Sequence, residues 1–105
     1  MEVDLELRKH VESIAEEIES SVRKGRLGEL LQGALELKRL QSLVSGKWET
    51  RGYELTMAWG GPGIWFNTWD CEVEGRWGLS EYRKKLPRDV CDEVDDYLNE
   101  IYGGI

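Results

Sequence analysis

The sequence is poor in the side chains that most often perform catalysis or bind metals. Its 105 residues include one histidine, His10, and two cysteines, Cys71 and Cys91. Neither cysteine belongs to a Cys-X-X-Cys motif or has a histidine at ligand spacing, so we expect two buried free thiols and no metal site. His10 stands in a charged segment and is expected to be solvated. Without a paired nucleophile and base, we expect neither an enzyme nor a cofactor.

Long apolar runs are also missing. No segment approaches the ~18 consecutive apolar residues that a membrane-spanning helix requires. The first residues, MEVDLELRKH, are charged where a signal peptide would be apolar. We therefore expect a cytoplasmic protein without membrane contact. With 40% hydrophobic and 33% charged residues, the chain has the composition of a globular protein, and its length predicts a single domain, 1–105.

Basic residues are scarce in the second half of the chain. Residues 48–105 contain twelve acids and six bases, whereas residues 1–47 contain nine acids and eight bases, and the net charge is −7. A surface of this charge repels the phosphates of nucleic acids. The charge distribution therefore favours a basic protein partner and disfavours direct nucleic-acid binding.

Aromatic residues and glycines are concentrated in residues 53–77. Alternating apolar and polar residues predict strands at 53–59, 64–69 and 71–77, with a turn at Gly60-Gly61-Pro62-Gly63. The predicted register pairs Trp59 with Ile64, Met57 with Phe66 and Leu55 with Thr68, and then Phe66 with Val73 and Ile64 with Gly75. It predicts one core face: Leu55, Met57, Trp59, Ile64, Phe66 and Val73.

The opposite face of the middle strand presents Trp65, Asn67 and Trp69. Two tryptophans on one face need an explanation, because large aromatic side chains seldom face water without a role. Either helices cover them in a sandwiched sheet, or they form an exposed patch that binds a partner. The sequence leaves both alternatives open.

The first half of the chain has helical periodicity. Residues 4–24 predict an amphipathic helix that ends at Gly25, and residues 27–44 predict a second helix that ends at Ser45-Gly46. The apolar surface of the second predicted helix is too wide for one neighbour. It favours a homodimer in which this helix contacts a second copy.

The segment after the meander predicts a strand and a helix. Residues 78–86 predict an edge strand whose charges deter further pairing, and residues 87–103 predict a helix with one apolar stripe. The other face of this helix is acidic, and we expect it to face solvent. It is either a plain solvated face or a recognition surface for a basic partner; its acids are Asp89, Asp92, Glu93, Asp95, Asp96 and Glu100.

These elements predict an α+β fold. It consists of an N-terminal helical hairpin (1–46), an antiparallel meander of three or four strands (47–86) and a C-terminal helix (87–103) packed on the sheet. Residues 53–103 resemble a group of small uncharacterised proteins of phages, plasmids and integrated elements. The shared features are the GGP turn, a downstream tryptophan (Trp77) followed by a tyrosine (Tyr82), and a final helix that ends in Tyr102-Gly103. The resemblance implies a genomic context and no catalytic residue.

The sequence is compatible with three functions and favours the first. The absence of a catalytic pair, the acidic half and the surplus tryptophans favour a non-enzymatic protein-interaction module. The alternative is a mobile-element mimic of nucleic-acid charge that inhibits a DNA-binding protein, which would need carboxylates spaced like phosphates beyond the last helix. Acid–base chemistry by carboxylates such as Asp70 with Glu72 or Glu74 is the enzymatic alternative.

Overall fold

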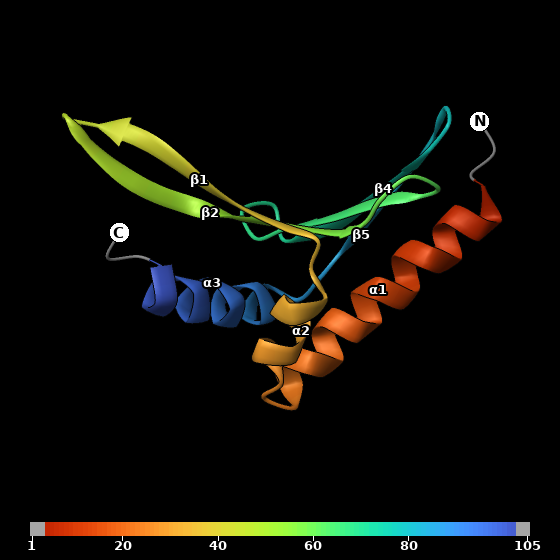
Figure 1. Cartoon of the computed structure of the whole chain (residues 1–105), viewed down its shortest axis with the longest axis horizontal. Helices are drawn as coiled ribbons and strands as arrows, with labels where there is room; N and C mark the ends of the chain where they lie inside the picture. Colours follow the sequence, from red (N-terminus) through yellow and green to blue (C-terminus); the bar gives the residue numbers. More distant parts are fainter. Residues whose placement is uncertain (1–3, 103–105) are drawn as a thin grey trace.

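The computed structural model describes residues 4–102, which form three helices on one side of a five-stranded antiparallel sheet (Figure 1). The sheet has the chain order β1-β2-β3-β4-β5, and α3 packs against β2. This confirms the predicted α+β class and the C-terminal helix on the sheet, although the strands number five. The elements are α1 (Leu5–Arg23), α2 (Leu27–Gly33), β1 (Glu36–Val44), β2 (Lys47–Ala58), β3 (Gly63–Asn67), β4 (Glu72–Trp77), β5 (Ser80–Lys85) and α3 (Arg88–Tyr102). The predicted helix end at Gly103 lies outside the described residues.

Helix α1 forms as its sequence predicts. The side chain of Asp4 accepts hydrogen bonds from the backbone N–H groups of Glu6 (2.9 Å) and Leu7 (3.1 Å), which caps the first turn. Its apolar residues recur every three or four positions and are buried against β4 and β5: Leu7, Val11, Ala15, Ile18 and Val22. The side chain of Val11 occupies the place where a Cβ of Gly75 would lie. Glycine in β4 therefore lets α1 approach the sheet closely.

The predicted second helix is wrong beyond Gly33. The segment that follows is strand β1, which pairs with β2 along its whole length. Ser45 and Gly46, which we expected to end a helix, instead form the two-residue turn of the β1–β2 hairpin. Both have positive φ (51° and 81°), as a type I′ hairpin turn requires. Leucines three residues apart suit a helix by spacing, but pairing with β2 decides the conformation.

The register of the central strands is partly as predicted. Phe66 pairs with Val73 and Ile64 with Gly75, which confirms the β3–β4 register. The β2–β3 register is wrong by two residues: Leu55 lies opposite Phe66, and an irregularity between Thr56 and Ala58 removes Met57 from the ladder. Because a shift of two preserves the face, Leu55 and Phe66 remain in the core, fully buried.

Trp59 and Met57, which the sequence predicts in the core, are not part of the buried core. Trp59 follows the end of β2 and is 58% exposed, and Met57 is only partly buried at the edge of the core. In the shifted register Ala58 is the last paired residue of β2, so Trp59 lies in the connection to β3. The remaining predicted core residues Leu55, Ile64, Phe66 and Val73 are buried.

Cys71 and Cys91 are buried, as expected, but they are not free thiols. They form a disulfide, with Cα atoms 5.8 Å apart, that joins the start of β4 to the first turns of α3. The two residues are 20 positions apart in sequence, and strands β4 and β5 lie between them. After β5 the chain passes the start of β4, where the Leu86 N–H donates a 2.9 Å hydrogen bond to the Cys71 carbonyl, and this return brings the cysteines together. Spacing alone does not reveal this return.

The distal half of the β1–β2 hairpin, residues 40–51, extends past the helices, and we call it the arm (Figure 1). At the other edge of the sheet, β5 confirms the predicted edge strand. Its side chains Glu81, Arg83, Lys84 and Lys85 are exposed and charged, which deters pairing with another sheet. The two edges therefore differ in character, because β1 carries leucines.

Candidate binding surfaces

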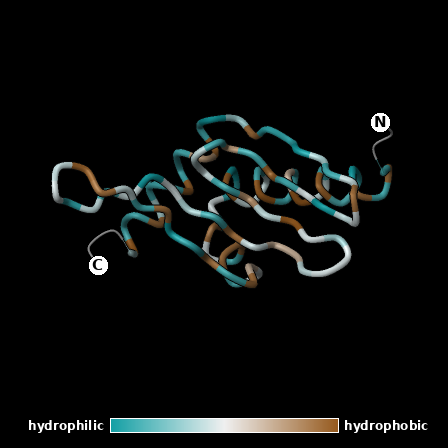
Figure 2. Tube along the Cα trace, turned by 90° about the horizontal axis from the view of Figure 1, so that it is seen from above, coloured by the Kyte–Doolittle hydropathy of each residue, from teal (hydrophilic) through white to brown (hydrophobic). Residues whose placement is uncertain are grey.

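The sheet face opposite the helices is covered by no described helix or strand, and Figure 2 looks onto it. Trp65 projects from β3 on this face, since its neighbours Ile64 and Phe66 are in the core. Its indole ring lies back over Gly63, where an added Cβ would be 2.7 Å from Cη2 of the ring. Trp65 is therefore a flat, half-buried platform. The sandwiched-sheet alternative is wrong for this tryptophan.

A shallow depression of about 210 Å³ adjoins this platform. It is lined by Glu54, Trp65, Asn67, Glu74 and Arg76. Of the carboxylates on the described strands, Glu54 is the one without an ion pair. An aromatic face beside an unpaired carboxylate is a combination that attracts cations.

The other acids on this face are already satisfied. Glu72, almost fully buried, pairs with Arg83 (3.4 Å) and Lys85 (3.3 Å) of β5. Glu74 pairs with Arg76 (2.7 Å) and with Arg83 (3.7 Å). Burial of Glu72 is tolerated because both bases neutralise it. These ion pairs neutralise Glu72 and Glu74, two of the six acids in residues 47–86.

Trp69 lies in the turn between β3 and β4 and is also half-buried. Its ring packs against Gly52, where an added Cβ would be 3.2 Å from Cε3. A second depression, of about 160 Å³, joins it to Glu54 and to Leu40 of β1. Glu54 thus borders the depressions of both tryptophans, which places Trp65 and Trp69 on one surface, as the sequence predicts.

The acidic residues of α3 form a second surface, on the helix side of the sheet. Asp89 accepts a 2.6 Å hydrogen bond from Arg23, which holds the pKa of its carboxyl below the ordinary value. Asp92 pairs with Arg88 at 3.4 Å. The remaining exposed acids have no ion pair with any residue in the range 4–102: Glu93, Asp96 and Glu100. Acids in the last turns of a helix oppose its dipole, so nothing within this helix favours them.

Asp95 departs from the expected solvent-facing stripe. It is half-buried, and its Oδ1 atom is fully buried without a hydrogen-bond partner among the described residues. Burial raises the pKa of this carboxyl, and the nearby hydroxyl of Thr68 offsets only part of that effect. Asp95 therefore belongs to the packing between α3 and the sheet, and the acidic surface consists of the other five residues.

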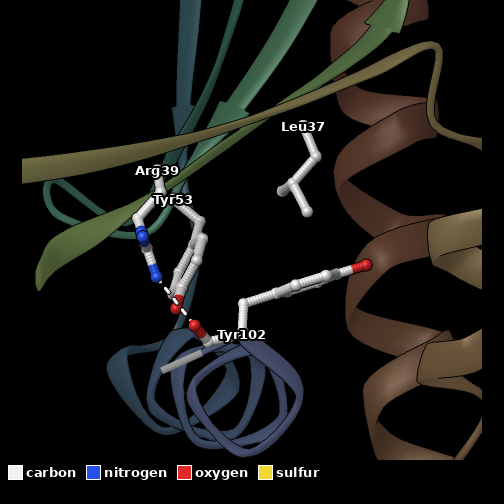
Figure 3. Close-up of a pocket in the computed structure, with 4 residues that line it drawn as sticks. All are labelled: Leu37, Arg39, Tyr53 and Tyr102. Carbon is white, nitrogen blue, oxygen red and sulfur yellow. Dashed lines mark hydrogen bonds between the residues drawn. The ribbon is translucent and has the colours of Figure 1, made fainter. Parts of the chain in front are cut away.

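A third surface, which sequence reasoning missed, lies where the arm leaves the body of the protein. A depression of about 260 Å³ is lined by Leu37, Arg39, Tyr53 and Tyr102, whose side chains border the same space in Figure 3. Arg39 donates a 2.7 Å hydrogen bond to the carbonyl of Tyr102, and the hydroxyl of Tyr53 donates to Asn99 (2.8 Å). Assigning residues 36–44 to a helix concealed this surface.

The arm itself exposes apolar side chains. Leu40 is 44% exposed, Leu43 is 61% exposed and Trp48 is 67% exposed. Leu43 pairs with Trp48 across the hairpin, so both lie on the same face of the arm. Leu40 and Leu43, which the sequence predicts on a helix, are therefore exposed on a strand hairpin.

Within residues 4–102 no cluster of three or more histidine, cysteine or acidic residues is arranged to hold a metal ion. In the same range no helix is long and apolar enough to cross a membrane. No known protein family, curated protein or solved structure matches this chain.

Proposed function

We propose that this chain is a non-enzymatic protein-interaction module that binds a basic protein through the uncovered face of its sheet. The observation that supports this function is the unpaired carboxylate of Glu54 beside the flat ring of Trp65. A lysine or arginine side chain of a partner can lay its aliphatic part on the indole and direct its charge to Glu54. The resulting contact combines an aromatic anchor with charge complementarity.

The overall charge of the protein supports the same partner class. At −7, the chain attracts basic proteins over distances longer than a contact, which raises the rate of encounter. The free acids of α3 lie on the far side of the sheet from Trp65, so they contribute to this attraction and not to the contact itself. The nucleic-acid mimic stays an untested alternative: in the described residues the free acids of α3 do not continue onto the sheet, whose acids other than Glu54 are paired.

Two further parts of the proposal concern assembly and location. We propose a homodimer, because the arm exposes large apolar side chains, and exposed apolar patches commonly mark protein–protein contacts. The cytoplasmic location and the likeness to proteins of mobile elements stay predictions from the sequence. The Cys71–Cys91 disulfide weighs against a reducing compartment.

The direct test is a titration followed by NMR. The probe is a twelve-residue peptide of alternating arginine and serine, with an equally long peptide of alternating glutamate and serine as the negative probe. We expect saturable shifts of the Trp65 indole N–H and of the Glu54 amide with the basic peptide alone. Trp65→Ala should weaken binding at least tenfold, whereas Trp59→Ala, which removes an exposed tryptophan elsewhere, should leave it unchanged. Shifts confined to α3, or no saturation, would contradict the proposed site.

A further inference from the structure

Strand β1 is an open sheet edge with an apolar character. It ends the sheet on one side, and its exposed leucines contrast with the charged side chains of β5 at the other edge. Within residues 4–102 no strand pairs with the outer edge of β1, and a nine-residue edge strand is a template for another strand. The occupant that fits must therefore offer a matching strand.

The hairpin determines which backbone groups of β1 face the open edge. Val44 and Lys47 flank the two-residue turn, so they exchange both hydrogen bonds across the hairpin. Alternation along the strand then turns the backbone N–H and C=O groups of Leu43, Gln41 and Leu37 away from β2. Tyr53, which lies opposite Arg39 in β2, gives an independent check of this alternation. Its N–H donates to the Thr68 hydroxyl and its C=O accepts from the Thr68 N–H, at 2.9 Å each, so its backbone groups point to the β3 side and not to β1.

The side chains of β1 are self-complementary in one antiparallel register. A two-fold axis at Leu40 places Leu37 opposite Leu43 of the second copy, Leu40 opposite Leu40, and Arg39 opposite Gln41. It also pairs residues whose backbone groups face the edge. Moving the axis one residue toward the start of β1 sets Arg39 against Arg39, and moving it the other way sets Arg39 against Leu43. The first of these registers places like charges opposite each other, and neither register pairs leucine with leucine within β1.

We propose that a second copy of this chain pairs antiparallel with β1, with the two-fold axis at Leu40, to form a continuous ten-stranded sheet. Each Leu43 then lies against Leu37 of the other copy, beside the depression that Leu37, Arg39, Tyr53 and Tyr102 line. Trp48 and Leu43 of one copy continue into Leu37 and Leu55 of the other as one apolar row. The exposed Leu43 on the arm of one copy thus covers the open depression beside Leu37 of the other copy.

The size of the contact predicts moderate affinity. A nine-residue strand is about 30 Å long, and side chains on both faces make the contact about 20 Å wide, or roughly 600 Å² per copy. This is at the lower end of stable protein interfaces, so we expect association in the micromolar range. The inference deepens the dimer of the proposed function and rests on it.

The first experiment measures mass against concentration by sedimentation equilibrium. We expect a shift from 12.1 kDa toward twice that mass as the concentration rises through the micromolar range. Leu43→Asp should weaken association at least tenfold, and Leu79→Asp, at a fully exposed leucine in the β4–β5 turn, should not change it. Circular dichroism verifies that both variants are folded. A constant monomer mass overturns the dimer and this pairing together.

The second experiment tests the register by cross-linking under a mild oxidant. Both native cysteines are in a disulfide, so a single added cysteine supplies the only thiol in each molecule. Leu40→Cys should form a linked dimer rapidly, because the two Cβ atoms lie about 5 Å apart at the axis. Ser42→Cys should not, because its copies are displaced by four residues, about 13 Å along the strands.

The outcomes separate the two proposals. A linked Leu40→Cys dimer with an unlinked Ser42→Cys supports the register, whereas the reverse overturns it. A dimer that links in neither variant overturns pairing along β1 and leaves the proposed dimer standing on another surface. Binding of the basic peptide is measured separately, so its loss or persistence bears on the sheet face alone.

Discussion

The indole ring of Trp65 lies across the backbone of Gly63. A Cβ at position 63 would be 2.7 Å from Cη2 of the ring and 3.3 Å from Cζ2, closer than side chains pack. Gly63 does not have a positive φ, so its role is to leave room for the ring. The orientation of the Trp65 ring, the proposed anchor, therefore depends on the absence of a side chain at Gly63.

Gly63→Ala should displace the ring with little change in the fold. We expect a loss of about 1–3 kcal/mol in stability from overpacking. We also expect weaker binding of the basic peptide, measured by the same titration, because the platform tilts out of the face. Gly33→Ala is the matched control, since an added Cβ there meets nothing within 4 Å. Unchanged peptide affinity in Gly63→Ala would show that the flat ring is not part of the site.

The shape of the core follows from the sequence where two patterns agree. Helical spacing and a capping Asp4 define α1, and alternation together with a tight turn defines β3 and β4. The β2–β3 register could not be predicted, because the irregularity at Met57 has no sequence signature and the glycine-rich connection allows more than one length. β1 was assigned to a helix because Leu37, Leu40 and Leu43 satisfy a three-residue spacing.

The candidate surfaces were predictable to different degrees. Alternation correctly placed Trp65 on the face opposite Phe66. It could not predict that Glu54 has no ion pair, because that depends on which carboxylates the arginines of β4 and β5 contact. Helical periodicity placed Asp92 and Asp96 in solvent correctly and Asp95 wrongly. Asp95 lies at the boundary of the apolar stripe, where the packing angle of the helix decides burial.

Phe66→Ala and Trp59→Ala should differ sharply in stability. Phe66 is fully buried at the centre of the sheet, and its truncation should cost about 3–5 kcal/mol in the free energy of unfolding. Trp59 is 58% exposed in a connection, so its truncation should change that energy by less than about 1 kcal/mol. Urea denaturation followed by circular dichroism measures both. A large loss in Trp59→Ala would restore the register expected from the sequence.

Reduction of the disulfide should destabilise the protein. The bond between Cys71 and Cys91 closes a loop of 20 residues, for which the loss of the cross-link costs about 3 kcal/mol. The urea midpoint should therefore fall on adding a reductant, and the double change of Cys71 and Cys91 to Ser should reproduce the fall. In that double variant the reductant should have no further effect. Two titratable thiols in the unreduced protein would contradict the bond.

Asp95 and Asp89 should have opposite effects on stability as the pH changes. Burial raises the pKa of Asp95, so its ionisation opposes folding, and Asp95→Asn should raise the thermal midpoint at pH 7. Arg23 lowers the pKa of Asp89, so this carboxylate stabilises the fold above its unfolded pKa of about 3.8 and loses that effect in acid. Asp89→Asn should therefore lower the midpoint at pH 7, and this difference should disappear as the pH falls through the lowered pKa of Asp89. Equal shifts of one sign would contradict these environments.

Charge reversal on α3 should change how fast the basic peptide binds more than how tightly. Asp92, Glu93 and Asp96 are exposed on the helix side, away from Trp65, so they act on the peptide only through long-range attraction. Such attraction weakens as salt reduces the Debye length from ~10 Å at 0.1 M to ~3 Å at 1 M. The triple change to Lys should therefore slow association at low salt and have little effect at high salt, as measured by stopped-flow fluorescence.

The dissociation rate distinguishes the two candidate surfaces. If the peptide contacts the sheet face, Trp65→Ala should speed its dissociation while the triple α3 variant leaves the dissociation rate unchanged. If the peptide instead contacts α3, the triple variant should abolish binding at every salt concentration, and Trp65→Ala should have no effect. That second result would move the binding site to the acidic helix, because a rim charge changes association whereas a contact residue changes dissociation.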